Sequence, residues 1–130
     1  MTAPDATLNH LRSLCLALPE AEERTTWDSQ TFRIRGRIFA MHVPARELGR
    51  EPGPVLWCKA PKGVQHLLVE ADPTRFFRPP YVGPKGWIGL RLDARTDWAE
   101  VDALVRRSWA MTAPRRLAAT LAPPEPPNGG

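Results

Sequence analysis

The residues best suited to chemistry lie in one loop, where residues 79–91 read Pro-Pro-Tyr-Val-Gly-Pro-Lys-Gly-Trp-Ile-Gly-Leu-Arg. Glycines let backbone N–H groups approach a phosphate or carboxylate, Lys85 adds positive charge, and Tyr81 and Trp87 offer rings on which a base can stack. The loop is not a Walker loop, because the Gly-x-x-x-x-Gly-Lys-Ser/Thr pattern is missing. A purely structural alternative also fits: proline and glycine turn the chain sharply while Trp87 anchors the core.

A second group of basic residues flanks Gly36, in the stretch Phe32-Arg33-Ile34-Arg35-Gly36-Arg37-Ile38-Phe39-Ala40. A glycine between two alternating runs indicates a tight β-hairpin, with Arg33 and Arg35 on one face and Arg37 at the turn. Such a wing can lay guanidinium groups along a phosphate backbone. The alternative is that these arginines form an ordinary solvated strand face, since arginine outnumbers lysine fifteen to three in this chain.

Two hypotheses of different class follow. In the first, a nucleic-acid-binding module, with DNA as the candidate partner, contacts phosphates through Arg33, Arg35, Arg37, Lys59, Lys85 and Arg91. Arg115 and Arg116 would extend this footprint. In the second, a small-ligand or protein-interaction module uses an aromatic groove formed by Trp27, Tyr81, Gly83, Gly86 and Trp87. Binding in the first hypothesis falls with salt, whereas binding in the second varies little with salt.

The length and composition of the chain limit the kind of protein it can be. The chain has 130 residues, a formal net charge of +4 and a hydrophobic content of 42%, which fits one domain over residues 1–121. The Pro- and Gly-rich residues 122–130 predict a disordered tail. No apolar run is long enough to span a bilayer and no secretory signal opens the chain, so we expect a monomeric cytoplasmic protein.

Catalysis and metal chemistry find little support in the residue pattern. Cys15 and Cys58 read as buried, reduced thiols, and neither paired cysteines nor paired histidines occur at metal-ligand spacing. No serine lies in a Gly-x-Ser-x-Gly elbow, and no pair of carboxylates is placed for acid–base work. We therefore expect a protein that is not an enzyme and uses no metal or cofactor.

The helices follow from apolar spacing. Residues 6–18 repeat leucine and cysteine along one face, with Asp5 as N-cap and Pro19 as the stop. Residues 61–71 form a second helix with an apolar stripe of Val64, Leu67 and Leu68. The third begins at Asp97, where Glu100 completes a capping-box pattern. Its inner face carries Trp98, Val101, Leu104, Val105 and Trp109, and a short final helix covers 115–121.

Alternation of apolar and polar residues predicts the strands. They cover residues 24–29, 31–35, 37–43, 55–59 and 87–92, while Glu20–Glu23 reads as a solvated acidic connection and 44–54 as a loop. Residues 74–78 place two phenylalanines against the second helix. The expected fold class is α+β: an antiparallel meander packed against helices, in the order helix, three or four strands, helix, strand, helix and short helix.

In this order and spacing the chain resembles the MmcQ/YjbR-like family, from about Leu8 to Leu117. The matching motifs are Leu18-Pro19-Glu20, Thr25-Thr26-Trp27, the hairpin 32–40, Lys59 at a strand end, residues 80–87 and Val105-Arg106-Arg107-Ser108-Trp109. A tyrosine is more usual where Trp109 stands. The resemblance implies an antiparallel sheet backed by helices and a DNA-binding role, from a fold likened to a double-winged arrangement. It implies no catalytic residue.

Overall fold

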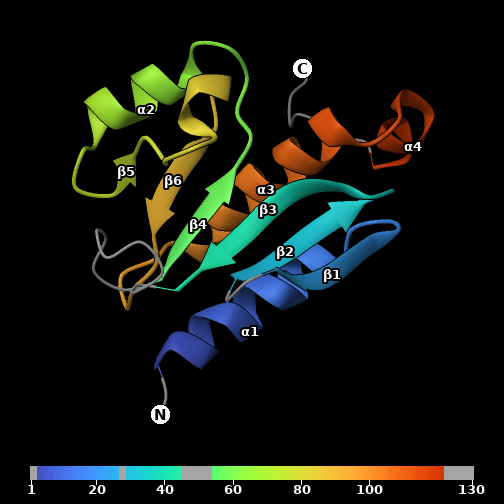
Figure 1. Cartoon of the computed structure of the whole chain (residues 1–130), viewed down its shortest axis with the longest axis horizontal. Coiled ribbons are helices and arrows are strands. Elements are labelled where there is room, and N and C mark those ends of the chain that lie inside the picture. Colours follow the sequence, from blue (N-terminus) through green and yellow to red (C-terminus); the bar gives the residue numbers. More distant parts are fainter. Residues whose placement is uncertain (1–2, 27–28, 45–53, 122–130) are drawn as a thin grey trace, which may run out of the picture.

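The computed structural model describes residues 3–26, 29–44 and 54–121, which form one antiparallel sheet with helices packed on one face (Figure 1). In chain order, its elements are α1 (Ala3–Leu16), β1 (Ala21–Thr26), β2 (Ser29–Ile34), β3 (Arg37–Val43), β4 (Val55–Cys58), α2 (Val64–Ala71), β5 (Phe76–Phe77), the short 3₁₀ helix η1 (Gly83–Lys85), β6 (Ile88–Arg91), α3 (Trp98–Thr112) and α4 (Arg115–Thr120). The strands described are arranged β1-β2-β3-β4-β6-β5. The α+β antiparallel fold predicted from the sequence is therefore confirmed.

The main core lies between the sheet and helices α1 and α3. Phe32, Leu56 and Leu90 point to this face from three strands, and Leu11 of α1 and Val105 of α3 pack against them. All five side chains are at most 2% exposed. Each strand alternates, so the next residues along it face the other way and build a second apolar layer. That layer contains Val43, Val55, Trp57 and Trp87, on the face opposite α1 and α3.

The β2–β3 hairpin has the tight turn that Gly36 predicts. Ile34 pairs with Arg37, so Arg35 and Gly36 alone make the turn, and both have positive φ, 53° and 82°. Two residues with positive φ define a type I′ turn, whose twist matches that of the strands. One residue further in, the register shifts, because Phe32 pairs with Ala40 and Arg33 with Ile38. Phe39 is the extra residue of this bulge and is fully buried.

Four expectations about the elements are wrong. The residues predicted as one strand, 24–29, belong to two, because β1 ends at Thr26 and β2 begins at Ser29. Residues 20–23 are not a solvated connection, because β1 begins at Ala21 and Glu23 bonds with Arg12 of α1. Asp5 lies inside α1, which begins at Ala3, so it is not the N-cap. In α2, Leu67 is 63% exposed, and the inner face is formed by Val64, Leu68 and Val69 instead.

At the start of α3, Asp97 is the N-cap as expected, but Glu100 binds Arg75. Asp97 Oδ1 accepts hydrogen bonds from the backbone N–H groups of Ala99, at 3.0 Å, and Glu100, at 3.3 Å. The N-cap is thus confirmed. The carboxylate of Glu100 binds the guanidinium of Arg75 at 2.6 Å, which links α3 to the segment before β5. Phe76 and Phe77 form β5, which contacts α2 as expected and also pairs with β6 as a strand that was not predicted.

Two expected features lie outside the described residues: the loop at 45–53 and the tail at 122–130. Across the described ranges, no helix combines the length and the apolar character needed to cross a membrane.

Candidate functional site

Three basic residues meet at one end of the sheet. Antiparallel pairing brings the start of β3, with Arg37, to the same end of the sheet as Lys59, which follows β4, and Lys85, which ends η1 shortly before β6. Burial lowers the pKa of Lys59 below its ordinary value, and the positive charges of Arg37 and Lys85 lower it further. Arg37 and Lys85 therefore both lie close enough to Lys59 to act on its charge. We call Arg37, Lys59 and Lys85 the basic cluster.

No carboxylate neutralises the basic cluster within the described residues. The ion pairs found there between arginines and carboxylates involve Arg12, Arg35, Arg75 and Arg106. Two guanidinium nitrogens of Arg107, Nε and Nη2, are also buried without a hydrogen-bond partner in the same ranges. Arg107 acts electrostatically on Cys58, the residue before Lys59, while Arg37 and Lys85 are exposed.

Ser108 of α3 fixes the strand ends that carry two of these residues. Its hydroxyl donates to the carbonyl oxygen of Phe39 at 2.6 Å and accepts from the backbone N–H of Lys59 at 2.9 Å. Phe39 is the bulge residue, two positions after Arg37, so one buried hydroxyl holds β3 and β4 to α3 at the basic cluster.

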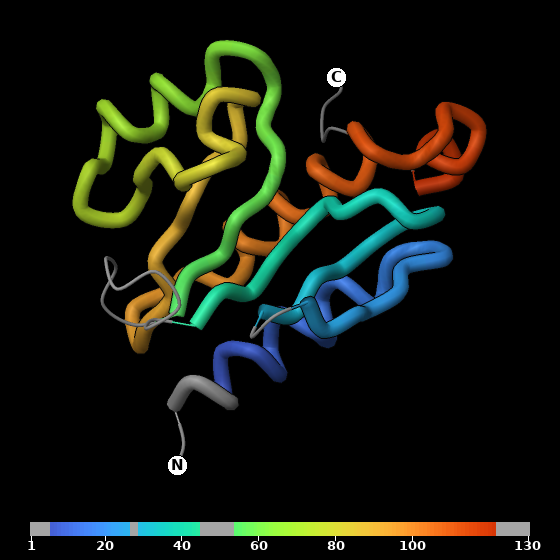
Figure 2. Tube along the Cα trace, in the orientation of Figure 1, coloured from blue at the N-terminus to red at the C-terminus, as the bar shows by residue number. Residues whose placement is uncertain are grey.

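The third member of the cluster lies on a constrained loop. Gln65 Nε2, from α2, donates to the carbonyl oxygens of Gly83 at 2.8 Å and Trp87 at 2.6 Å. Gly86, with φ 92°, closes η1 by donating its N–H to the Gly83 carbonyl. Figure 2 shows this loop, in yellow, beside the green segment that follows β4. Lys85 is thus held in a defined position relative to Lys59.

The other predicted hairpin residues are placed differently. Arg33 lies on the face opposite α1 and α3, where its guanidinium donates to the hydroxyls of Thr31 at 3.0 Å and Thr26 at 3.1 Å. Arg35 does not share that face, because it occupies the turn with left-handed φ. Its guanidinium instead binds both carboxylate oxygens of Glu20 and lowers the pKa of that carboxyl. Arg35 is therefore neutralised, and the hairpin is not a wing of three free arginines.

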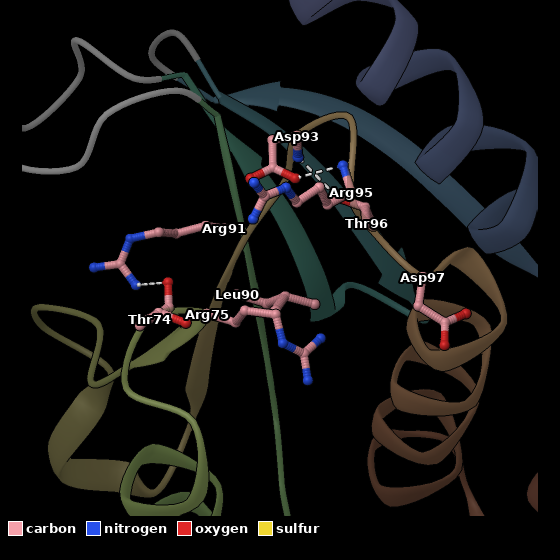
Figure 3. Close-up of a pocket in the computed structure, with 8 residues that line it drawn as sticks. All are labelled: Thr74, Arg75, Leu90, Arg91, Asp93, Arg95, Thr96 and Asp97. Atoms are coloured by element: carbon pink, nitrogen blue, oxygen red, sulfur yellow. Dashed lines mark hydrogen bonds between the residues drawn. The ribbon is translucent and has the colours of Figure 1, made fainter.

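Arg91, another residue predicted to contact phosphates, lies at the end of β6 that is away from the basic cluster. It donates to the Thr74 carbonyl at 3.2 Å and places its guanidinium 5.0 Å from the centre of the Phe77 ring. It lines a pocket of about 200 Å³ with Thr74, Arg75, Leu90, Asp93, Arg95, Thr96 and Asp97 (Figure 3). Arg75 is held there by Asp72 and Glu100, so this pocket combines both signs of charge.

The residues predicted to form an aromatic groove do not lie together either. Trp87 is 8% exposed and packs with Trp57 in the second apolar layer, whereas Tyr81 is 77% exposed. Gly83 is buried against the side chain of Arg78, and Gly86 closes η1. Trp27 lies outside the described residues. Tyr81 and Trp87 are therefore not the two walls of one groove.

The chain's thiols and histidines do not form a reactive centre in the described residues. Cys15 and Cys58 are free and buried, and burial raises the pKa of the Cys58 thiol to about 12. His10 stacks on Trp98 at 4.0 Å, His42 lies 3.0 Å from the Thr7 hydroxyl, and His66 pairs with Glu70. Within those ranges, no group of three or more potential ligands could hold a metal ion.

Sequence reasoning missed Ser108 and Gln65, the two residues that position the cluster. No local pattern indicates the role of Ser108, because its contacts join residues 49 and 69 positions apart. Gln65 had no signal beyond being polar on the inner side of a short helix.

Fold and cluster together define a class of small α+β proteins in which a single antiparallel sheet is backed by α1 and α3. The chain belongs to the YjbR family, whose model matches residues 16–111. It is also similar to the Deinococcus radiodurans protein DR2400, whose crystal structure carries a domain described as DUF419. That similarity has a TM-score of 0.66 at 22% identity and covers 80% of this chain and 76% of the other. No curated protein matches the chain.

Proposed function

We propose that this protein binds nucleic acid through the phosphate backbone, with the basic cluster as the central contact and without catalysing a reaction. The observation that carries the proposal is that strand pairing places Arg37, Lys59 and Lys85 at the same end of the sheet, with no ion pair to a carboxylate among the residues described. Gathering like charges costs free energy, and a bound polyanion removes that cost by supplying the missing negative charge.

The geometry favours a backbone over a single small anion. The cluster spans three strand ends, and Arg37 and Lys85 are both exposed, so their side chains can reach successive phosphates. Arg33 lies outside this contact, because its guanidinium is directed along β2 to Thr31 and Thr26, away from the hairpin turn that precedes Arg37. Contacts of this kind position a nucleic acid but carry no sequence information, so we expect affinity with little sequence preference.

Fluorescence anisotropy with a labelled oligonucleotide tests the proposal. Lys59→Ala/Lys85→Ala should weaken binding at least about tenfold at low salt, because two phosphate contacts are lost. The matched control is Arg95→Ala/Arg106→Ala, which removes the same charge at exposed positions outside the cluster. Equal weakening by both variants, or no binding of the wild type at micromolar protein, would contradict the proposal.

A further inference from the structure

Tyr81 presents its ring to solvent in an unusual backbone conformation. Tyr81 is 77% exposed. Its backbone φ is 66°, a left-handed value that a bulky residue rarely adopts. Folding alone gains little from this arrangement, because an exposed ring buries no area. Strained, exposed residues of this kind are concentrated at binding sites.

The exposure does not come from a loose loop. The N–H of Val82 donates to the Pro80 carbonyl at 2.6 Å, and the N–H of Trp87 returns to the Val82 carbonyl at 3.3 Å. Pro79, two residues before Tyr81, is buried. Since Gln65 also holds Gly83 and Trp87, the backbone on both sides of Tyr81 is fixed.

The same loop joins the ring to the basic cluster. The N–H of Lys85 donates to the Val82 carbonyl at 3.0 Å, so the residue next to Tyr81 is hydrogen-bonded directly to a member of the cluster. Lys85 in turn acts electrostatically on Lys59. One constrained segment therefore carries both the exposed ring of Tyr81 and Lys85, the member of the basic cluster that acts on Lys59.

We propose that the segment recognised at this end of the sheet is single-stranded nucleic acid, with one unpaired base stacked on Tyr81 while neighbouring phosphates contact Lys85 and Lys59. This inference rests on the proposed function and names its substrate class. Sites for single strands combine a basic track with exposed aromatic rings, because every base has a π-face. In a duplex the bases already stack on one another, so Tyr81 adds nothing to duplex binding.

The test compares a labelled single-stranded oligonucleotide of about 12 nucleotides with its duplex, a length within the range of single-strand sites. The wild type should bind the single strand more tightly. Tyr81→Asn keeps a residue that tolerates left-handed φ but removes the ring, and should weaken single-strand binding about 5- to 150-fold. Tyr81→Phe should bind like the wild type.

Two controls separate this inference from the proposed function. Leu67→Ala removes another exposed apolar side chain, from α2, and should change neither affinity. Lys59→Ala/Lys85→Ala should weaken both ligands. If Tyr81→Asn binds the single strand as well as the wild type while the lysine variant is weakened, the stacking inference is wrong and the proposed function survives. If neither ligand binds the wild type, both are wrong.

Discussion

The hydroxyl of Ser108 donates a 2.6 Å hydrogen bond to the carbonyl oxygen of Phe39, which joins the C-terminal half of α3 to the bulge in β3. The same oxygen accepts the backbone N–H of Lys59, so Ser108 satisfies two backbone groups and is itself 0% exposed. The ends of β3 and β4, and with them Arg37 and Lys59, are therefore positioned from the helix side of the sheet.

Ser108→Ala should lower the free energy of unfolding by about 2 kcal/mol, because it leaves a buried carbonyl and a buried N–H unsatisfied. Urea denaturation measures the change. Ser13→Ala is the control, since Ser13 is exposed and bonds only to the His10 carbonyl of its own helix. A loss for Ser108→Ala no larger than for Ser13→Ala would show that these hydrogen bonds do not hold the strand ends.

Gly89→Ala should also destabilise the protein, by about 1–3 kcal/mol through overpacking. A Cβ at position 89 would lie 2.4 Å from Cζ of Phe77, whose ring covers the glycine on the face opposite α1 and α3. The comparison is a double-mutant cycle in urea with Phe77→Ala. Gly89→Ala should cost less once the ring is absent, and an equal cost in both backgrounds would rule out this clash.

Acid should weaken the contact between α1 and the β1–β2 pair. The Arg12 guanidinium donates to both carboxylate oxygens of Glu23, at 2.7 and 2.8 Å, and lowers the pKa of Glu23 below its ordinary value of 4.5. A carboxyl with a lowered pKa in the folded state stabilises the fold above that ordinary value. This stabilisation is lost as the pH falls through the folded-state pKa.

The variant that tests this is Glu23→Gln, followed by urea denaturation at pH 7 and pH 3. It should cost about 1 kcal/mol at pH 7, where the ion pair is complete, and much less at pH 3. A cost that is the same at both values of pH would mean that the charge of Glu23 contributes nothing.

The two thiols should be inert in the native protein. Cys15 and Cys58 are both 0% exposed, and burial raises the pKa of each above its ordinary value. Since the thiolate is the reactive form, a disulfide reagent at pH 8 should modify neither cysteine until the protein is unfolded in guanidinium chloride. Rapid modification of either native thiol would contradict the packing described for α1 and β4.

Local patterns predicted most of the fold. Gly36 between alternating runs gave the hairpin, and Asp97 before an apolar helical repeat gave the start of α3, because both signals depend on residues a few positions apart. The first half of β1, residues 21–23, was read as a solvated connection because its acidic residues are paired across the fold: Glu23 binds Arg12, eleven residues away. Leu67 was misplaced because its apolar character suited the stripe, whereas α2 turns its Val69 side inward.

The sequence predicted only part of the candidate site, because the neighbours of each cation depend on residues far apart in the chain. Sequence reasoning named Arg37, Lys59 and Lys85, but it grouped them with Arg35, which pairs with Glu20, and Arg91, which lies at the other end of β6. Which cations meet depends on strand pairing and on turn geometry, since a two-residue turn removes Arg35 from the strand face. Sequence alone gives charge and spacing but not these neighbours.

The salt dependence of binding tests the basic cluster most directly. For the wild type, the logarithm of the association constant should fall linearly with the logarithm of the salt concentration, and Lys59→Ala/Lys85→Ala should reduce the slope by about 1.4 for a single strand, since each phosphate contact contributes about 0.7. Arg95→Ala/Arg106→Ala should leave the slope unchanged. A slope that is the same in the wild type and in the lysine variant would contradict phosphate binding by this cluster.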